Sequence, residues 1–173
     1  MNQLQLEVCQ AHDDSLLLKG VYEFEHFRDG KKIGQYRIEN AVVNVGKNKI
    51  LDIMFNGVTP LTTWYMGLVD NAGFSAFAAA DTMASHAGWA ESTAYTESTR
   101  PQWTVGSASS QSVTNATPVT FDINATGTMN GIFIISDNTK GGTSGTLWGE
   151  GSFSSTVSVN NGDQLKGTYT LSC

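Results

Sequence analysis

Hydrophobic and polar residues alternate with period two in two neighbouring stretches near the start of the chain. The first spans residues 21–27 and the second residues 32–43, with Arg-Asp-Gly-Lys between them. An Asp-Gly pair between alternating runs is a strong signal for a β-hairpin. In such a hairpin Tyr22, Phe24 and His26 share one face. The pattern therefore predicts a hairpin with one apolar face.

The hydrophobic period changes after the hairpin. Apolar positions recur at helical spacing within residues 44–56, which predicts one short helix. A strand is expected at residues 62–69. Residues 70–100 form a long irregular stretch, in which Asp81 could cap at most one short helical turn. A loop of this length inside a compact domain is usually functional or part of an interface.

From Arg100 onward the pattern is typical of β-structure throughout. Candidate strands alternate with turns rich in Gly and Asn, at a spacing that favours a sandwich or a barrel. These strands are expected at residues 102–106, 119–123, 131–136, 146–154 and 164–171. Residues 21–173 are thus predicted to form a single all-β domain.

Residues 1–20 allow two interpretations. Leu4, Leu6 and Val8 alternate as in an edge strand, and an apolar run follows at residues 16–18. An ordinary first strand has this pattern, and so does an arm that packs on a neighbouring molecule. Both interpretations remain open at this point.

Composition and charge exclude several classes of protein. Hydrophobic residues make up 40% of the chain and charged residues only 15%, while Ser, Thr, Asn and Gly exceed a third. The net charge of −6 argues against nucleic acid as a partner, because such binding needs cations to neutralise phosphates. No apolar stretch is long enough to span a membrane. The N-terminal sequence lacks signal-peptide order, so synthesis in the host cytoplasm is expected. Cys9 and Cys173 are expected to be free thiols there, although a disulfide is an alternative.

No motif predicts catalysis, a metal or a cofactor, and we expect a protein that is not an enzyme. The three histidines lie in no metal-ligand spacing. His86 is expected to lock the long loop through a hydrogen bond. Glu23 and Glu25 share a strand face at a separation open to glycosidase chemistry, but Lys32 and Arg37 on the returning strand favour a charge ladder. His26 is expected in a cross-strand polar pair.

The four tryptophans fall into two groups. Trp64 and Trp103 alternate with apolar neighbours and are expected in the core. Trp148 lies in a strand that has few other large side chains, and Trp89 lies in the long loop. If any aromatic side chain anchors an interface, the sequence favours these two.

Several segments together resemble a known class of viral protein. They are the Asp-Gly hairpin and the segments at residues 40–52, 63–69, 86–95, 100–103 and 162–171. This sequence resembles the small virion proteins of tailed bacteriophages, in particular their cement or decoration proteins. The resemblance implies a jelly-roll-like β-sandwich and a structural homotrimer on the capsid exterior. There it would bind the major capsid protein at subunit junctions and stabilise the shell.

With that role, the candidate interface residues are Leu16, Leu17, Arg28, Lys31, His86, Trp89 and Trp148. Two other functions remain open from the sequence. One is a carbohydrate- or receptor-binding module of a tail or fibre, in which an exposed aromatic ring stacks on a sugar. The other is a small hydrolase that uses Glu23 and Glu25 or His86.

Overall fold

A computed structural model describes residues 18–173 of the chain, and Leu16 and Leu17 lie outside this range. Eleven helices and strands follow one another along the described part. They are β1 (Lys19–Arg28), β2 (Lys31–Val42), α1 (Asn44–Phe55), β3 (Trp64–Asp70), β4 (Glu91–Ser92), β5 (Gln102–Trp103), β6 (Ser112–Thr114), β7 (Val119–Asp122), β8 (Gly127–Ile135), β9 (Leu147–Val159) and β10 (Gln164–Ser172).

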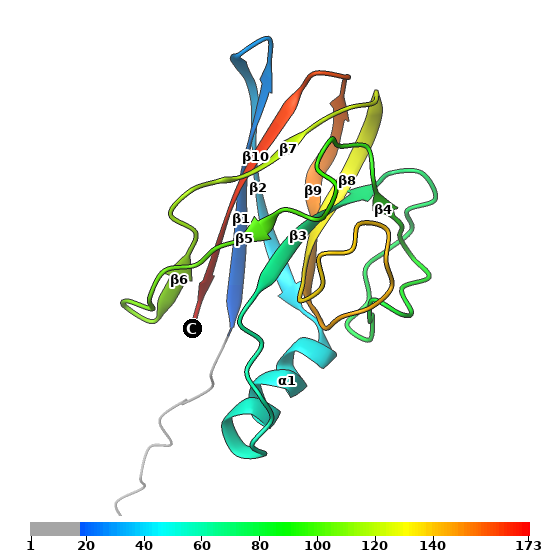
Figure 1. Cartoon of the computed structure of the whole chain (residues 1–173). Coiled ribbons are helices and arrows are strands. Elements are labelled where there is room, and N and C mark those ends of the chain that lie inside the picture. Colours follow the sequence, from blue (N-terminus) through cyan, green and yellow to red (C-terminus); the bar gives the residue numbers. More distant parts are fainter. Residues whose placement is uncertain (1–17) are drawn as a thin grey trace, which may run out of the picture.

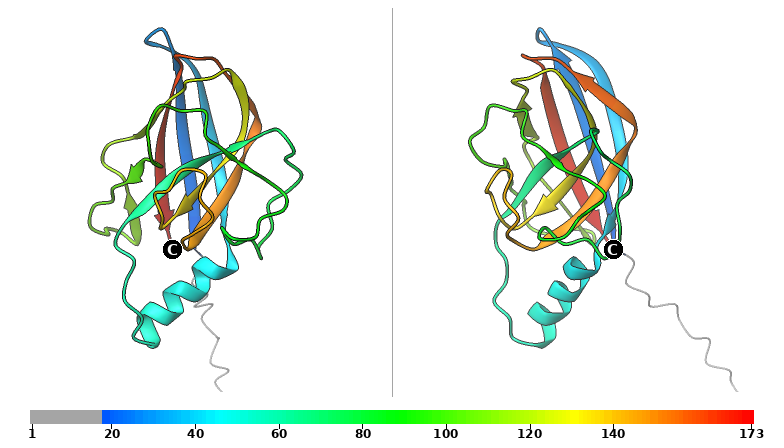
Figure 2. Two further views of the ribbon diagram at one scale, coloured as in Figure 1. Left: turned by 45° about the vertical axis from the view of Figure 1, so that its right-hand side comes forward. Right: turned by 90° about the vertical axis from the view of Figure 1, so that its right-hand side faces the viewer.

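The strands form one curled antiparallel sheet whose two halves face each other (Figures 1 and 2). The strand order is β4-β3-β8-β9-β2-β1-β10-β6, with β5 beside β3 and β7 beside β10. One layer therefore holds β2, β1, β10, β6 and β7, and the other holds β9, β8, β3, β4 and β5. The predicted all-β, sandwich-like fold with one short helix is confirmed.

The predicted hairpin is present as β1 and β2. Asp29 and Gly30 form the turn, with φ angles of 50° and 72° that suit a two-residue hairpin loop. Tyr22 and Phe24 are fully buried on the inner face, as their period-two spacing predicts. On the outer face, Lys32 pairs with Glu25 at 2.6 Å. These exposed charges form part of the expected ladder, although Arg37 pairs with Glu39 and not with a glutamate of β1.

Strand β2 belongs to both layers. Up to Asn40 it pairs with β1, and its last residues pair with β9, Ala41 opposite Glu150 and Val42 opposite Gly149. A Cβ on Gly149 would lie 2.4 Å from the Asn40 side-chain nitrogen and 3.0 Å from the Ala41 carbonyl oxygen, so glycine favours this close approach. The crossing of β2 closes one edge of the sandwich and places α1 directly after it.

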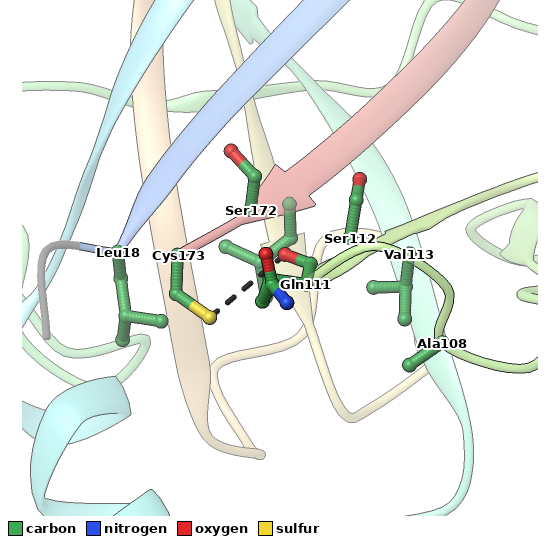
Figure 3. Close-up of a pocket in the computed structure, with 8 residues that line it drawn as sticks. Leu18, Ala108, Gln111, Ser112, Val113, Ser172 and Cys173 are labelled. Atoms are coloured by element: carbon green, nitrogen blue, oxygen red, sulfur yellow. Dashed lines mark hydrogen bonds between the residues drawn. The ribbon is translucent and has the colours of Figure 1, made fainter.

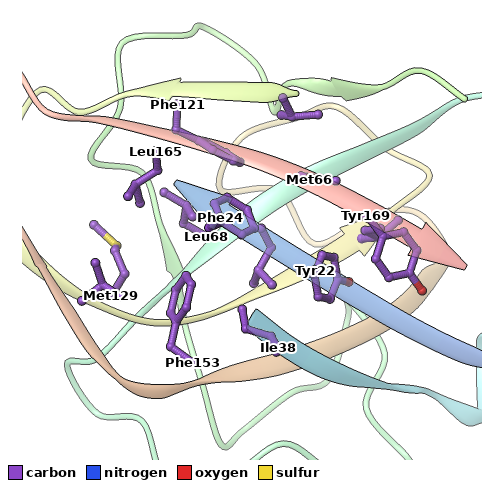
Figure 4. Packing of buried hydrophobic residues seen from close by; sticks show 14 of the residues in the cluster. Tyr22, Phe24, Ile38, Met66, Leu68, Phe121, Met129, Phe153, Leu165 and Tyr169 are labelled. Carbon is purple, nitrogen blue, oxygen red and sulfur yellow. The ribbon is translucent and has the colours of Figure 1, made fainter. Parts of the chain in front are cut away.

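The main core fills the space between the layers (Figure 4). Phe24 of β1 meets Phe153 of β9 edge-to-face at 5.8 Å, and Tyr22 lies 4.3 Å from Tyr169. Aromatic pairs at these distances add to the free energy gained from burying their area. The core therefore joins strands from both layers.

A second apolar cluster covers the outer face of β8. Trp89 and Met83 of the long loop pack with Phe133 and Ile135, and the Trp89 ring lies 5.1 Å from that of Phe133. Residues Ile132 to Ile135 are consequently buried on both faces of their strand. The loop at about residues 70–100 is irregular, as predicted, but it acts as a third layer. The helical turn predicted at Asp81 is absent, because its carboxylate instead accepts from Ala78 N and Trp89 Nε1.

A buried carboxylate connects β1 to the turn between β9 and β10. Asp163 accepts two hydrogen bonds from Arg28, at 2.7 and 2.8 Å, and one from Asn160 N. It also lies 2.8 Å from His26 Nε2. The predicted cross-strand polar pair of His26 is therefore present, because β1 lies beside β10 and Asp163 directly precedes that strand. The Arg28 guanidinium holds the pKa of Asp163 well below its ordinary value.

Replacing Asp163 tests this connection. Because the folded-state pKa of Asp163 is lowered, its stabilising effect is present at neutral pH and is lost as pH falls through the acid range. Asp163→Asn should lower the free energy of unfolding at pH 7 by about 2–4 kcal/mol and flatten its dependence on acid pH. Urea unfolding at several pH values measures both effects. Asp29→Asn, an exposed change in the same hairpin, is the control and should match the wild type.

Candidate functional site

The exposed large hydrophobic side chains gather at one end of the molecule. Among the described residues, three of the five lie on α1: Leu51, Met54 and Phe55, with 56%, 67% and 82% of their surface exposed. The helix projects from the end of the sandwich where β1 begins and β10 finishes (Figures 1 and 2). Ile33, near the hairpin tip, is the exposed hydrophobic residue at the opposite end. We call Leu51, Met54 and Phe55 the α1 patch.

The first turns of α1 are fixed to the sandwich and its last turn is not. Val43 N donates to Trp148 O at 3.1 Å, just before the helix begins. Gly46 lies so close to Trp148 that an added Cβ would be 2.6 Å from its carbonyl oxygen. Ile50 packs against the main core, whereas Met54, predicted on the same helical stripe, is exposed. The helix therefore presents its C-terminal half to solvent.

An apolar groove opens beside α1, between the two layers. Its first part, about 200 Å³ in volume, is lined by Leu18, Ala108, Gln111, Ser112, Val113, Leu171, Ser172 and Cys173 (Figure 3). A second part of similar volume is lined by Trp64, Trp103, Val105, Val113, Trp148 and Leu171. Val113 and Leu171, cross-strand partners in β6 and β10, line both parts. The two parts are therefore neighbours that share a pair of wall residues, and together we call them the groove.

The polar edges of two groove tryptophans are already satisfied. Trp103 Nε1 donates to Asn115 Oδ1 at 3.1 Å, and Trp148 Nε1 donates to the Tyr169 hydroxyl at 3.0 Å. Asn115 Oδ1 also accepts from Tyr169 N, so this amide joins β5 to β10. With both indole N–H groups engaged inside the protein, these walls offer an apolar surface. An aliphatic or aromatic group suits the groove better than a polar one.

The structure places Trp89 and Trp148 inside the molecule and not on its surface. Trp89 is 4% exposed and packs against Phe133 of β8, and Trp148 is 7% exposed and packs against Trp64 of β3. His86 stacks on Trp89 at 3.9 Å, and its Nδ1 lies 3.0 Å from Trp89 O. His86 thus locks the loop as expected. Trp64, predicted in the core, is half-buried and lines the groove.

The two predicted basic interface residues lie at the hairpin tip, far from the α1 patch (Figure 1). Arg28 forms an ion pair with Asp163 and is partly exposed, and Lys31 is exposed. The structure therefore separates a charged tip from an apolar end. The sequence analysis did not predict the α1 patch. Three bulky apolar residues near the end of the predicted helix could have indicated it.

A pair of buried carboxyl groups lies beneath the long loop. Glu150 of β9 is 2% exposed, and its Oε2 has no hydrogen-bond partner among the described residues. Burial, together with the charge of the neighbouring Asp81 carboxylate, raises the pKa of Glu150 to about 8. The Glu150 side chain is therefore mostly protonated at neutral pH in the folded protein.

Neither metal ligation nor a membrane-spanning helix is found in residues 18–173. No group of three or more His, Cys, Asp or Glu side chains converges there. The one helix is too short to cross a membrane. Cys173 is exposed and lines the groove, whereas Cys9 lies outside the described residues.

Comparison with known proteins connects this architecture to a virus. A family model described as "Podophage GP4 fiber I protein gp80" matches residues 41–169, which is most of the chain. The chain belongs to this family. No curated protein matches it. The match begins where β2 crosses between the layers and includes α1 and nearly all of the later strands.

Membership in the gp80 fibre family makes this protein a structural component of a bacteriophage virion. The resemblance to phage virion proteins is thus confirmed at that level. The family description names a fibre protein and not a capsid decoration protein. The predicted capsid location therefore stays a prediction.

Replacing Glu150 tests the buried carboxyl pair. Its pKa is about 8 in the folded protein against an ordinary value of 4.5, so the folded state binds more protons between these values. Stability therefore falls as pH rises through this window. Glu150→Gln should weaken that fall and raise Tm at pH 8 by about 5 °C. Thermal unfolding from pH 5 to 8 measures it. Glu23→Gln, an exposed change, is the control, and equal pH slopes in wild type and Glu150→Gln would contradict the assignment.

Proposed function

We propose that this protein is a non-enzymatic structural subunit of the virion that self-associates through its α1 patch. The exposure of Leu51, Met54 and Phe55 carries the proposal. Removing such side chains from water is favourable by about 25 cal/mol per Å² of apolar surface. A cluster of this kind at one end of a monomer is typical of an interaction site.

A homotrimer is the assembly that the resemblance implied, and the position of the α1 patch supports it. Because the patch lies at one end, copies can meet there around a common axis and leave their charged hairpin tips apart (Figure 1). A closed ring of this kind does not propagate into filaments. The hairpin tips, with Lys31, then remain available for another virion protein.

The family description favours a position in a fibre over one on the capsid exterior. Binding to the major capsid protein at subunit junctions is the alternative position. Imaging of purified virions with a labelled antibody against this protein distinguishes them. Label confined to the capsid shell would contradict the fibre position, and label on a fibre or tail would support it.

Self-association is tested with a double change in the patch. Leu51→Ser/Phe55→Ser should convert the assembled protein into monomers, because two of the three exposed apolar side chains are lost. Light scattering after size-exclusion chromatography measures the mass. Ile33→Ser, which removes an exposed hydrophobic residue at the other end, is the matched control and should leave the assembly intact. If the wild-type protein is monomeric at high concentration, the proposal is wrong.

A second candidate function is carbohydrate or receptor binding, and the half-buried ring of Trp64 in the groove favours it. Aromatic rings stack on the apolar faces of sugars, but orientation and specificity need polar groups as well. Trp64→Ala should abolish glycan-array binding if this function is real. Trp148 is a poor choice for that test, because its loss would also unpair the buried Tyr169 hydroxyl. No glycan signal for the wild type would exclude the candidate.

A further inference from the structure

The long loop rests on the sandwich through few buried side chains. Residues 71–89 of this loop, which we call the lobe, are mostly exposed or half-buried, and their buried residues are Asp81, Met83 and Trp89. Met83 and Trp89 pack in the apolar cluster over β8. Asp81 carries a carboxyl group, and a buried carboxyl group needs a polar partner. Asp81 is therefore a polar anchor in an otherwise apolar contact.

The partner of Asp81 on the sandwich is a second carboxyl group. Glu150 of β9 is 2% exposed and forms a hydrogen bond with Asp81. Two carboxyl groups form a hydrogen bond only when one of them carries a proton, because an ionised carboxylate has no donor. In the described part of the chain, no N–H or O–H group donates to Glu150 Oε2. A proton is therefore the group that joins the two side chains.

We propose that Asp81 and Glu150 form a proton-dependent latch, which holds the lobe against the sandwich while one carboxyl group is protonated and releases it when both are ionised. The lobe then moves away as one unit, and the sandwich itself stays folded. This inference goes beyond the proposed function and does not depend on self-association.

Two other titratable groups of the described chain lie around this pair, and neither neutralises it. His86 stacks on Trp89, and its Nδ1 lies 3.0 Å from Trp89 O and not from a carboxylate. Tyr22 of β1 is fully buried, and burial raises its pKa well above the ordinary value, so it stays a neutral hydroxyl. No ion pair joins Asp81 or Glu150 to a basic side chain within residues 18–173.

The strands beside Glu150 add no compensating charge. Glu150 lies opposite Ala41 of β2 and Phe133 of β8. The Arg100 guanidinium lies 5.3 Å from the Phe133 ring, but it is paired with Glu91 at 2.7 Å. Like charges in a buried site repel each other much more strongly than in water. Loss of the shared proton therefore creates a repulsion that release of the lobe into water removes.

The proton leaves close to neutral pH. Burial, together with the charge of Asp81, raises the pKa of Glu150 to about 8 while the lobe is closed. In the released state the Glu150 carboxyl faces water, and its pKa returns to the ordinary value of 4.5. The closed state therefore binds more protons between these two values, and release becomes easier as pH rises through this window.

The lobe is held together by its own contacts and is closed at its base. Ser75 N donates to Gly88 O at 2.8 Å, and an added Cβ on Gly88 would overlap Ala76 O. At the base, Asp70 N donates to Ala90 O at 2.9 Å. These bonds do not involve the carboxyl pair. They can therefore persist when the lobe is released, with the base as the hinge.

Release of the lobe would reach helix α1. Asn44 N, at the start of the helix, donates to Ala79 O of the lobe at 2.8 Å. This bond has to break when the lobe moves away, and the apolar surface of Trp89 and Phe133 then becomes accessible. The latch therefore connects the protonation of two buried carboxyl groups to the first turn of the helix that carries the α1 patch.

Hydrogen exchange followed by mass spectrometry tests the latch in the full-length chain. Wild type is compared with Glu150→Gln from pH 5 to pH 8, always at the same pH, so that the intrinsic chemistry of exchange cancels. The glutamine amide can donate to Asp81 without a titratable proton, so the lobe of the variant should stay closed. In peptides from residues 71–89, the ratio of wild-type to variant exchange rates should rise by up to about tenfold per pH unit.

Low concentrations of urea separate release of the lobe from unfolding of the whole domain. Unfolding exposes a large surface and is strongly accelerated by urea, whereas release of the lobe exposes little. Peptides from β1 and β10 report on unfolding. Glu23→Gln, an exposed change in β1, is the matched control and should exchange like the wild type.

Each outcome decides the proposal. A ratio that rises with pH in lobe peptides, with exchange there nearly independent of urea, supports the latch. A ratio that stays constant from pH 5 to pH 8 overturns it. Lobe exchange that accelerates with urea as steeply as exchange in β1 also overturns it, because the lobe then opens only when the domain unfolds. Self-association is tested separately, since none of these measurements uses the α1 patch.

Discussion

The crossing of β2 from one layer to the other is the constraint on which the rest of the molecule depends. It requires β9 to pass so close to β2 that a Cβ on Gly149 would lie 3.0 Å from the Ala41 carbonyl oxygen. The same passage places Trp148 against the start of α1 and buries Glu150 beneath the long loop. The position of the helix, the wall of the groove and the buried carboxyl pair therefore all follow from one strand that serves two layers.

The two ends of the sandwich differ because different residues satisfy their polar groups. At the hairpin tip, Arg28 and His26 meet Asp163, and the remaining charges face water. At the other end, Asn115 and Tyr169 take up the indole N–H groups, so apolar ring surface lines the groove. Exposed apolar side chains on α1 extend that surface. Because the polar groups at this end are already hydrogen-bonded inside the protein, a partner that contacts it needs to supply no further hydrogen-bonding groups.

Local patterns predicted the elements that local chemistry determines. The Asp-Gly hairpin, the helix at 44–56 and most late strands could be found because turn residues and period lie within a few positions of one another. Strands β4 and β6 were missed, because a strand of two or three residues is too short to show a hydrophobic period. Such a strand forms only because a neighbouring strand pairs with it. β8 begins at Gly127 and β9 continues to Val159, beyond their predicted limits, because each long strand lies beside the other.

The site residues were harder to predict, because burial of a tryptophan is decided by distant segments. Trp89 and Trp148 looked available in the sequence, and the structure buries both. The long loop that suggested an interface instead covers β8, which needs apolar cover on its outer face because Phe133 and Ile135 point there. Arg100 fixes this cover through its 2.7 Å ion pair with Glu91 and a hydrogen bond to Gly142 O at the same distance. Once this side of the sandwich is covered, the described apolar surface is concentrated at α1 and the groove, and assembly contacts are expected to concentrate there as well.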